Sequence, residues 1–424
     1  MPFEVNLGNG LVFRTVRDER DVGRYVTFNA TYNNIYEGLT CACLLRHHPE
    51  TTLADYWLIE DEISGEIVST ICLIPWLCRY KGIDLRVAML EMVLTHPAYR
   101  GRGLVRTQIK RFLEEVRARA FDLSIIWGIP YYYRQYGYGY SLDGNVYESL
   151  PIWRIPDAPI EDCSPYSLRP ATVDNITRLA DLYRQAVSAL QVCVLRDAKY
   201  WDYLLRWAMF PVEILENEQS REIAGYSVMT RSPESKSIRV LESGIASAEA
   251  GLAFLRTLKA GVEGEILIAW PENGTLAQLA RSLGSQAMPG GQWLLCIPNM
   301  TRFLGKIGSV LESRLAASTW RGLTTDLIIN LFCEAYKLRF VAGKLVAVEP
   351  LGFVDSSMGA DGGHLCIPSE AFLRLVFGYR TLDELRDAWP DIVVKAESRS
   401  LVDILFPRML SYLHTPFHYM GPVS

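Results

Sequence analysis

The chain has 424 residues, of which 49% are hydrophobic and 21% charged, and its formal net charge at pH 7 is −5. This length exceeds that of one ordinary domain, and the apolar content is sufficient for buried cores, so we expect a globular protein of several domains. The acidic balance argues against a nucleic-acid-binding protein, which normally presents a basic surface.

Cysteine usage and the apolar runs limit the class of protein further. Nine cysteines are scattered without CxxC or Cys/His spacing, which argues against a disulfide framework and against zinc. We predict that no metal is bound. The first residues, MPFEVNLGNG, lack the basic start and apolar segment of a signal peptide. The longest apolar run, Ile67 to Cys78, is too short to span a bilayer. We therefore expect a cytoplasmic protein without membrane insertion.

The first 150 residues alternate strand-like and helix-like segments. Strands are predicted at 11–16, 55–61 and 66–72, and helices from Asp18 and at 39–47. A second group of segments follows, with an apolar strand at 89–95, a glycine-rich turn at 99–104, a helix at 105–120 and a second apolar strand at 123–129. Free N–H groups of such a turn and of a helix N-terminus favour a bound anion such as phosphate.

A second unit follows the linker Pro151 to Ser164 and repeats the same order of elements. It includes a helix at 248–260 and a strand at 265–270, and we interpret it as a diverged internal duplication. The corresponding stretch, Gly244 to Gly251, has no arginine–glycine turn. We therefore expect a structural copy without cofactor.

The character of the chain changes again from about Thr301. A helix at 301–316 precedes long strand-like runs at 326–336 and 338–348, and further helices lead to an aromatic tail at 417–424. This pattern predicts a third, α+β unit.

Two motifs carry chemistry. Arg100-Gly-Arg-Gly-Leu104 resembles the R/Q-x-x-G-x-G/A signature of the GNAT acetyltransferase superfamily, with Val105 replacing the small last residue. Glycines allow the backbone to approach a pyrophosphate, and arginines add charge. Tyr133-Arg-Gln-Tyr-Gly-Tyr138 resembles the Y-x-x-x-G-[FY] segment of the same superfamily.

The whole layout resembles the enhanced-intracellular-survival (Eis) family of N-acetyltransferases. Leu375–Leu385, Leu405–Pro407 and Thr415–Phe417 carry this resemblance in the third unit. The resemblance implies an α/β (α+β) fold with two GNAT-like mixed-sheet domains in tandem, catalytic at 1–150 and degenerate at 151–300, followed by a sterol-carrier-protein-like domain at 301–424. It also implies acetyl-CoA as co-substrate and assembly as a hexamer.

The resemblance further implies roles for single residues. Val93 and Thr95 would present strand backbone to the pantetheine arm of acetyl-CoA. The residues that would hold the pyrophosphate are Arg100, Gly101, Gly103 and Leu104. Tyr133 would be the general acid for the leaving thiolate, and the terminal carboxylate of Ser424 would be the general base.

Glu91 is an alternative general base. Strand alternation predicts that its side chain shares a face with Val93 and Thr95, although a buried, paired glutamate is the structural alternative. His414 and His418 lie near the expected active-site tail without metal-ligand spacing. The base stays open between Glu91, the Ser424 carboxylate and a water.

The leading hypothesis is an acetyl-CoA-dependent N-acetyltransferase. It would move an acetyl group by direct transfer to a primary amine of a small molecule or peptide, such as an aminoglycoside, a polyamine or a lysine side chain. The alternative is a non-catalytic acyl-CoA or lipid-binding carrier or sensor, because the third unit resembles a lipid carrier. Tyr133 together with the Arg100 to Gly103 turn favours the enzyme, since binding alone needs no general acid.

Overall fold

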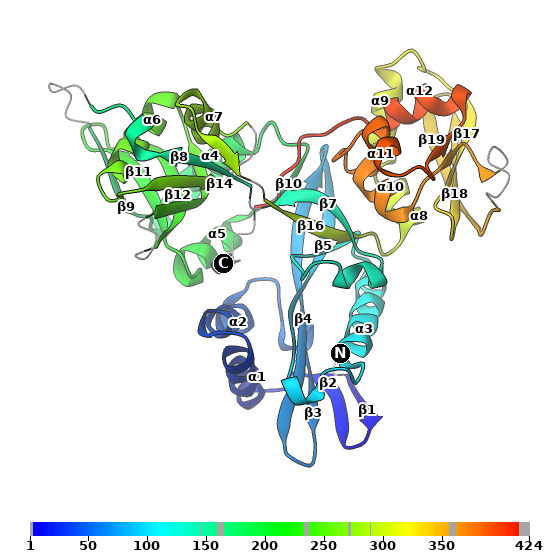
Figure 1. Ribbon diagram of the computed structural model, residues 1–424, viewed down its shortest axis with the longest axis horizontal. Helices are drawn as coiled ribbons and strands as arrows, with labels where there is room; N and C mark the ends of the chain where they lie inside the picture. The colour runs from blue at the N-terminus through cyan, green and yellow to red at the C-terminus, as the bar shows by residue number, and fades with distance from the viewer. Residues whose placement is uncertain are drawn as a thin grey trace.

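Three sheets organise the chain. In the computed structural model the described residues are 3–144, 146–158, 165–232, 237–269, 273–288, 290–355 and 362–414. Figure 1 shows a central lower body built on the first sheet, a second body at the left and a third at the right. Among these residues, no helix combines the length and apolar character needed to cross a membrane.

The first sheet is mixed and runs through most of the N-terminal part. Its strands, in spatial order, are β1 (Glu4–Gly8), β2 (Leu11–Thr15), β3 (Tyr56–Asp61), β4 (Glu66–Tyr80), β5 (Ile83–Thr95), β6 (Leu123–Ile126), β16 (Gly291–Cys296) and β7 (Gly139–Gly144), and β10 (Val192–Val194) pairs with β4. The strands from β1 to β5 are antiparallel neighbours, and β6 joins β5 in parallel. The strands predicted at 55–61, 66–72 and 89–95 correspond to β3, β4 and β5, which pair antiparallel in that order.

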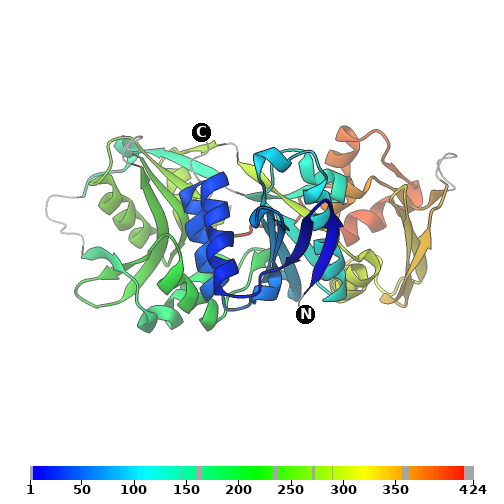
Figure 2. The same ribbon diagram turned by 90° about the horizontal axis from the view of Figure 1, so that it is seen from below.

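Helices cover both faces of this sheet. Figures 1 and 2 show α1 (Glu19–Tyr32) and α2 (Ile35–His47) on one side and α3 (Leu104–Ala118) on the other. The core under α1 and α2 contains Tyr25 and Cys41 together with Cys72 of β4. The core under α3 contains Phe112 and Leu90 of β5. The central strands β4 and β5 are therefore buried on both faces, as their long apolar runs indicate.

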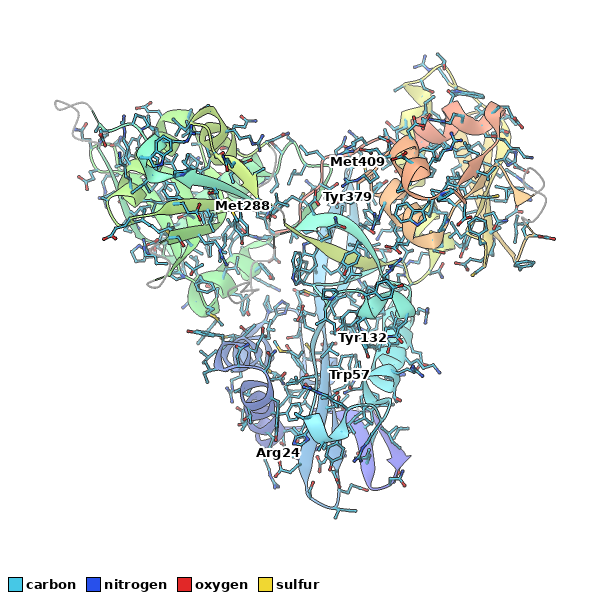
Figure 3. All side chains as sticks on the ribbon, viewed as in Figure 1. Arg24, Trp57, Tyr132, Met288, Tyr379 and Met409 are labelled. Carbon is cyan, nitrogen blue, oxygen red and sulfur yellow. The ribbon has the colours of Figure 1, made fainter. Side chains whose placement is uncertain are left out.

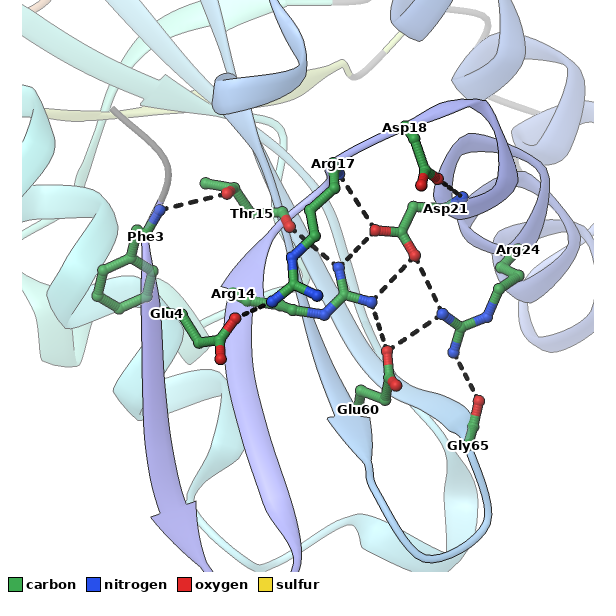
Figure 4. A network of polar contacts seen from close by, with 10 residues as sticks. All are labelled: Phe3, Glu4, Arg14, Thr15, Arg17, Asp18, Asp21, Arg24, Glu60 and Gly65. Atoms are coloured by element: carbon green, nitrogen blue, oxygen red, sulfur yellow. Dashed lines mark hydrogen bonds and ion pairs between the residues drawn. The ribbon is translucent and has the colours of Figure 1, made fainter.

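A buried ion cluster fixes the start of α1 to the sheet. Asp21, in the first turn of α1, accepts hydrogen bonds from Arg14 Nη2 at 3.0 Å and from the Arg17 amide at 3.1 Å. Arg14 also donates to Glu60 Oε2 of β3 at 2.5 Å (Figure 4). Burial raises the pKa of Asp21, but hydrogen bonding and the charge of Arg14 outweigh it, so this pKa is lowered overall. The Arg14 guanidinium of β2 thus joins α1 to β3.

The second sheet has strands, in spatial order, β15 (Gln286–Met288), β8 (Tyr147–Pro151), β14 (Glu265–Ala269), β13 (Ser237–Ile245), β12 (Ile223–Ser232), β11 (Val212–Asn217) and β9 (Tyr166–Pro170). The first two sheets exchange strands. β8 precedes the predicted linker yet pairs with β14, and β16 comes late in the chain yet lies between β6 and β7. Sheet membership therefore departs from the predicted boundaries at these strands, and the division into three domains stays a prediction.

The second unit repeats the central topology of the first. β12 and β13 are antiparallel, α6 (Ala248–Lys259) follows, and β14 returns parallel to β13. The helix starts differ. Ser247 caps α6 by accepting from the Ala250 amide at 3.1 Å, and Glu249 lies in its first turn. α3 begins at Gly103 without a side-chain cap and without an acidic residue. At the start of α6, Ser247 therefore binds a free backbone amide, and the charge of Glu249 repels an anion.

The remaining helices of the second unit are α4 (Ile176–Ala186), α5 (Ala198–Trp207) and α7 (Thr275–Ser282). The third sheet has strands β19 (Lys344–Gly352), β18 (Ala335–Val341), β17 (Thr325–Asn330), β20 (Leu365–Cys366) and β21 (Val393–Val394). The accompanying helices are α8 (Met300–Lys306), α9 (Gly308–Ala316), α10 (Ser369–Val376), α11 (Leu382–Ala388) and α12 (Ala396–Leu405).

The third unit is mixed α+β as predicted, with shorter elements. The predicted helix at 301–316 is divided into α8 and α9, and the run 326–336 turns at Phe332, whose φ is +68°. The third unit also contacts the first directly. Tyr80, at the end of β4, donates to the Val376 carbonyl of α10 at 2.6 Å. Tyr379 and Met409, labelled in Figure 3, lie on the side of the third unit that faces the first sheet.

Candidate active site

The glycine turn after β5 forms an open cradle of backbone. Gly101 and Gly103 have φ of +76° and +79°, in the left-handed region that favours glycine. A Cβ added at either position would meet no atom within 4 Å, so the space beside both backbones is open. Gly103 also precedes α3, whose first amides have no side-chain cap. These N–H groups are available to an anion.

Arginines surround this cradle. Arg100 Nε donates to the Thr95 carbonyl at 3.4 Å, which holds its side chain at the end of β5. Arg102 lies with its guanidinium carbon 4.5 Å from the ring centre of Tyr99. Arg106, in the first turn of α3, lines the cavity beside this turn. The positive charge and the helix N-terminus together favour a diphosphate.

A cavity of about 650 Å³ connects this turn with β5 and with the segment after β6. Its lining includes every residue predicted to hold the cofactor, namely Val93, Thr95, Arg100, Gly101, Gly103 and Leu104, and also Tyr133. Further lining residues that sequence reasoning missed are Arg106, Tyr132, Gln135 and Tyr136. The position of Arg106, one turn after the glycines at the helix start, is a signal that could have identified it.

The strand β5 has an open edge where it borders this cavity. It pairs with β6 only from Val87 to Met89, whereas its pairing with β4 continues to Thr95. β6 ends at Ile126. Beyond Met89, the pairing of β5 with a neighbouring strand on this side ends within the described part of the chain. Such an edge can bind the amides of an extended ligand.

A β-bulge in β5 corrects one prediction about Glu91. Cys72 pairs with Glu91 but Thr70 pairs with Leu94, and Met92 has a φ of +53°. Met92 and Val93 therefore stand opposite one residue of β4, which reverses the alternation. Cys72 belongs to the core beneath α1 and α2, whereas Val93 packs into the core beneath α3. Glu91 and Val93 thus lie on opposite faces, and the predicted shared face is wrong.

The charge of a second carboxyl group, that of Glu37 on α2, acts on Glu91. Glu91 is 9% exposed, and the pKa of its carboxyl group is raised well above its usual value by burial and then by Glu37 of α2. Burial also raises the pKa of Glu37. Cys41, one turn after Glu37 on α2, packs in the same core as Cys72, the cross-strand neighbour of Glu91. This side of β5 is therefore a weakly solvated, acidic region.

Tyr133 reaches the site from the short 3₁₀ helix η3 (Tyr132–Tyr136). Its side chain is 5% exposed and packs edge-on against Tyr132 and Tyr138. Burial, and then the nearby Glu91, raise the pKa of Tyr133 well above the usual range of a phenol. The phenol therefore retains its proton at neutral pH, and Tyr133 is among the residues that line the cavity.

The other predicted groups are distributed as follows. Glu91 lies on the face of β5 beneath α1 and α2, and it does not line the 650 Å³ cavity. Ser424 lies outside the described residues. The described ranges hold no group of three or more His, Cys, Asp or Glu side chains arranged for a metal ion.

Residues 42–141 match the family described as acetyltransferase (GNAT) domain. This range contains β3 to β6, the glycine turn, α3 and Tyr133. The first unit therefore contains a GNAT acetyltransferase domain. No curated protein is significantly similar to the chain in sequence.

Solved structures share the fold over almost the whole chain. A conserved protein of unknown function from Enterococcus faecalis V583, described as a probable N-acyltransferase, has a TM-score of 0.70 and 14% identity, covering 96% of this chain and 99% of its own. A GCN5-related N-acetyltransferase from Anabaena variabilis gives 0.68 and 14%, covering 95% and 99%. Eis1 from Mycobacterium abscessus gives 0.62 and 16%, covering 96% and 99%. These likenesses show the mixed α/β fold.

Proposed function

We propose that the protein is an acetyl-CoA-dependent N-acetyltransferase that transfers an acetyl group directly to a primary amine. One observation carries this proposal. A single cavity is lined by the arginine–glycine turn, by the open edge of β5 and by a buried, protonated tyrosine. Anion binding, amide pairing and proton donation are the three tasks that an acyl-CoA transferase requires of its chain.

Each part of the cavity has a distinct role in this proposal. The amides at Gly101, Gly103 and the start of α3, with Arg100 and Arg106, bind the pyrophosphate. The open edge of β5 near Val93 pairs with the pantetheine arm. Acetyl-CoA supplies an activated thioester. Backbone amides beside the bulge polarise its carbonyl, because fixed N–H dipoles stabilise developing negative charge.

Tyr133 acts as the general acid in this mechanism. When the amine nitrogen bonds to the acetyl carbon, the carbon–sulfur bond breaks, and Tyr133 gives its proton to the departing thiolate sulfur. The phenol is protonated at neutral pH, as a general acid must be, although its raised pKa also makes it a weaker acid toward the thiolate. The amine loses its proton to a base.

The base is Glu91, the terminal carboxylate of Ser424, or a water that passes the proton on. Burial strengthens Glu91 as a proton acceptor by raising its pKa, yet also reduces its ionised fraction. Aminoglycosides, polyamines and lysine side chains are the acceptor classes that we propose, in keeping with the Eis resemblance.

Thiol release from acetyl-CoA, measured across a panel of these amines, tests the proposal. We expect amine-dependent turnover in the wild type and a large loss of kcat in Tyr133→Phe, with acetyl-CoA binding retained in calorimetry. Equal turnover in both proteins would exclude Tyr133 as the general acid. Acetyl-CoA binding without turnover on any amine would instead identify the carrier or sensor that the third unit suggests.

A further inference from the structure

The helix α10 of the third unit contacts the segment that carries Tyr133, the 3₁₀ helix Tyr132–Tyr136. Arg134, the next residue along the chain, forms an ion pair with Glu370 in the first turn of α10. The Arg134 guanidinium carbon also lies 4.6 Å from the ring centre of Tyr131. Glu370 is only 16% exposed at its side chain, so the pair is shielded from water on that side. Shielding strengthens such a contact relative to a surface ion pair.

The contact continues along β7, which follows the Tyr133 segment. Arg374 Nε donates to the Tyr140 carbonyl at 2.8 Å, and its Nη2 lies 3.3 Å from Glu370 Oε1. Gly139 allows α10 to lie close to β7, because a Cβ added at Gly139 would stand 2.8 Å from Glu370 Cγ. The side chain of Glu370 therefore lies against both Gly139, at the start of β7, and Arg134, the residue after Tyr133.

The Tyr133 segment needs such external support. It consists of one short 3₁₀ helix that is flanked by left-handed backbone at Tyr131 and Gly137, with φ of +68° and +85°. Tyr131 is 72% exposed and Ile129 is 63% exposed. A second cavity of about 870 Å³ opens beneath the segment, between it and Glu370. The segment is therefore bordered by a cavity on each side, although the ring of Tyr133 itself is packed against Tyr132 and Tyr138.

We propose that Glu370 is a positioning residue, through which the third unit holds the Tyr133 segment in its reactive place by means of Arg134. The inference rests on the proposed function in one respect, the role of Tyr133 as general acid. It assigns the third unit a part in the transfer reaction, because a small displacement of a reacting group costs much of the rate.

Glu370→Gln tests the inference, because it removes the charge and keeps the size. Asp326→Asn is the matched control, since Asp326 pairs with Arg339 at 3.3 Å within the third sheet. Arg134→Gln and the double variant Arg134→Gln/Glu370→Gln complete a cycle. Three quantities are measured in full-length protein: kcat and KM for acetyl-CoA, the pH profile, and hydrogen exchange of residues 131–140.

We expect Glu370→Gln to lower kcat by about 10- to 100-fold and to speed hydrogen exchange in residues 131–140, while Asp326→Asn changes neither. Water that reaches a loosened Tyr133 lowers the phenol's pKa, so the basic limb of the pH profile shifts to lower pH. The double variant should be no slower than the slower single variant, because both act through one contact.

Kinetics and exchange in Glu370→Gln that match those of Asp326→Asn would overturn the inference. Losses that multiply in the double variant would overturn it too, since Glu370 would then act independently of Arg134. If the wild type turns over no amine, the proposed function fails on its own. Hydrogen exchange then decides the positioning role: faster exchange in Glu370→Gln supports it, and unchanged exchange refutes it.

Discussion

The ring of Tyr133 lies so close to the backbone of Gly128 that a Cβ added at Gly128 would stand 2.2 Å from Tyr133 Cδ2. No side chain fits in that space, so Gly128→Ala must displace the ring. Gly128 lies two residues after the end of β6. It is not among the glycines with a positive φ. Close packing, and not backbone strain, therefore requires glycine here.

We predict that Gly128→Ala lowers kcat by about 10- to 100-fold, the range expected when a reacting group moves by about 1 Å. Circular dichroism should show an unchanged fold, because the cavity beside the ring can accept it. Gly305→Ala is the control, since a Cβ at Gly305 of α8 meets nothing within 4 Å. Wild-type kcat in Gly128→Ala would mean that the position of Tyr133 is irrelevant to turnover.

The arginines at the glycine turn should govern acetyl-CoA affinity. Arg100→Gln and Arg106→Gln each remove a charged donor from the cavity, and a hydrogen bond to a charged group is worth about 1.5–3 kcal/mol. We expect each variant to raise KM for acetyl-CoA about 10-fold or more, with kcat at saturation nearly unchanged, because ground state and transition state lose the same contact.

Lys110→Gln supplies the comparison for these arginines, because Lys110 is exposed on the same helix and lies outside the cavity lining. Isothermal titration with acetyl-CoA at two salt concentrations measures the effect directly. A KM in Arg100→Gln and Arg106→Gln equal to that of Lys110→Gln would place the pyrophosphate elsewhere.

The second unit offers a contrasting helix start. Ser247 caps α6 with its own side chain, so Ser247→Ala should lower the free energy of unfolding by about 1 kcal/mol. It should leave KM for acetyl-CoA unchanged if the second unit binds no cofactor. Urea unfolding and steady-state kinetics on one preparation measure both. A changed KM would show that the second unit takes part in acetyl-CoA binding.

Local pattern predicted the glycine turn before α3, because its residues are contiguous; its role in phosphate binding stays a prediction. The glycines, the arginine and the start of α3 act through backbone conformation, which the residue types themselves dictate. The bulge at Met92 was not predictable in this way. Nothing about a methionine indicates a positive φ, which arises because β4 and β5 pair out of step on either side of it. Alternation therefore misplaced Glu91.

Long-range pairing also escaped prediction. β16 lies between β6 and β7, although more than a hundred residues separate it from either. The ion pair of Arg134 with Glu370 spans a still larger separation. Such contacts depend on how whole units dock, and hydrophobic periodicity reports only which face of an element is buried.

A buried ion pair in the second unit, close to His414, makes stability depend on pH. Arg196 donates to both carboxylate oxygens of Glu242, at 2.7 and 2.6 Å, and Tyr226 donates to the first at 2.7 Å. Burial alone would raise the pKa of Glu242, but Arg196 and then His414 outweigh it and lower this pKa to about 2. Burial lowers the pKa of His414 to about 4.

Both shifts have the same sign of linkage. The folded state keeps His414 neutral, whereas the unfolded chain protonates it near pH 6.5, so stability falls as pH falls from 6.5 to 4. The pKa of Glu242 is about 2 in the folded state and 4.5 in the unfolded chain. Its contribution to stability is therefore lost as the pH falls from 4.5 to 2. The free energy of unfolding should therefore begin to fall below pH 6.5 and fall further below 4.5.

His414→Gln should reduce the part of this fall between pH 6.5 and 4 by about 3 kcal/mol at most, since one pKa unit corresponds to about 1.4 kcal/mol. A residual fall should remain, because burial also lowers the pKa of His48 to about 4. Urea unfolding at pH 7, 5.5 and 4.5 measures the difference, and His47→Gln, at the end of α2, is the control. A pH dependence in His414→Gln identical to that of His47→Gln would show that folding does not shift the pKa of His414.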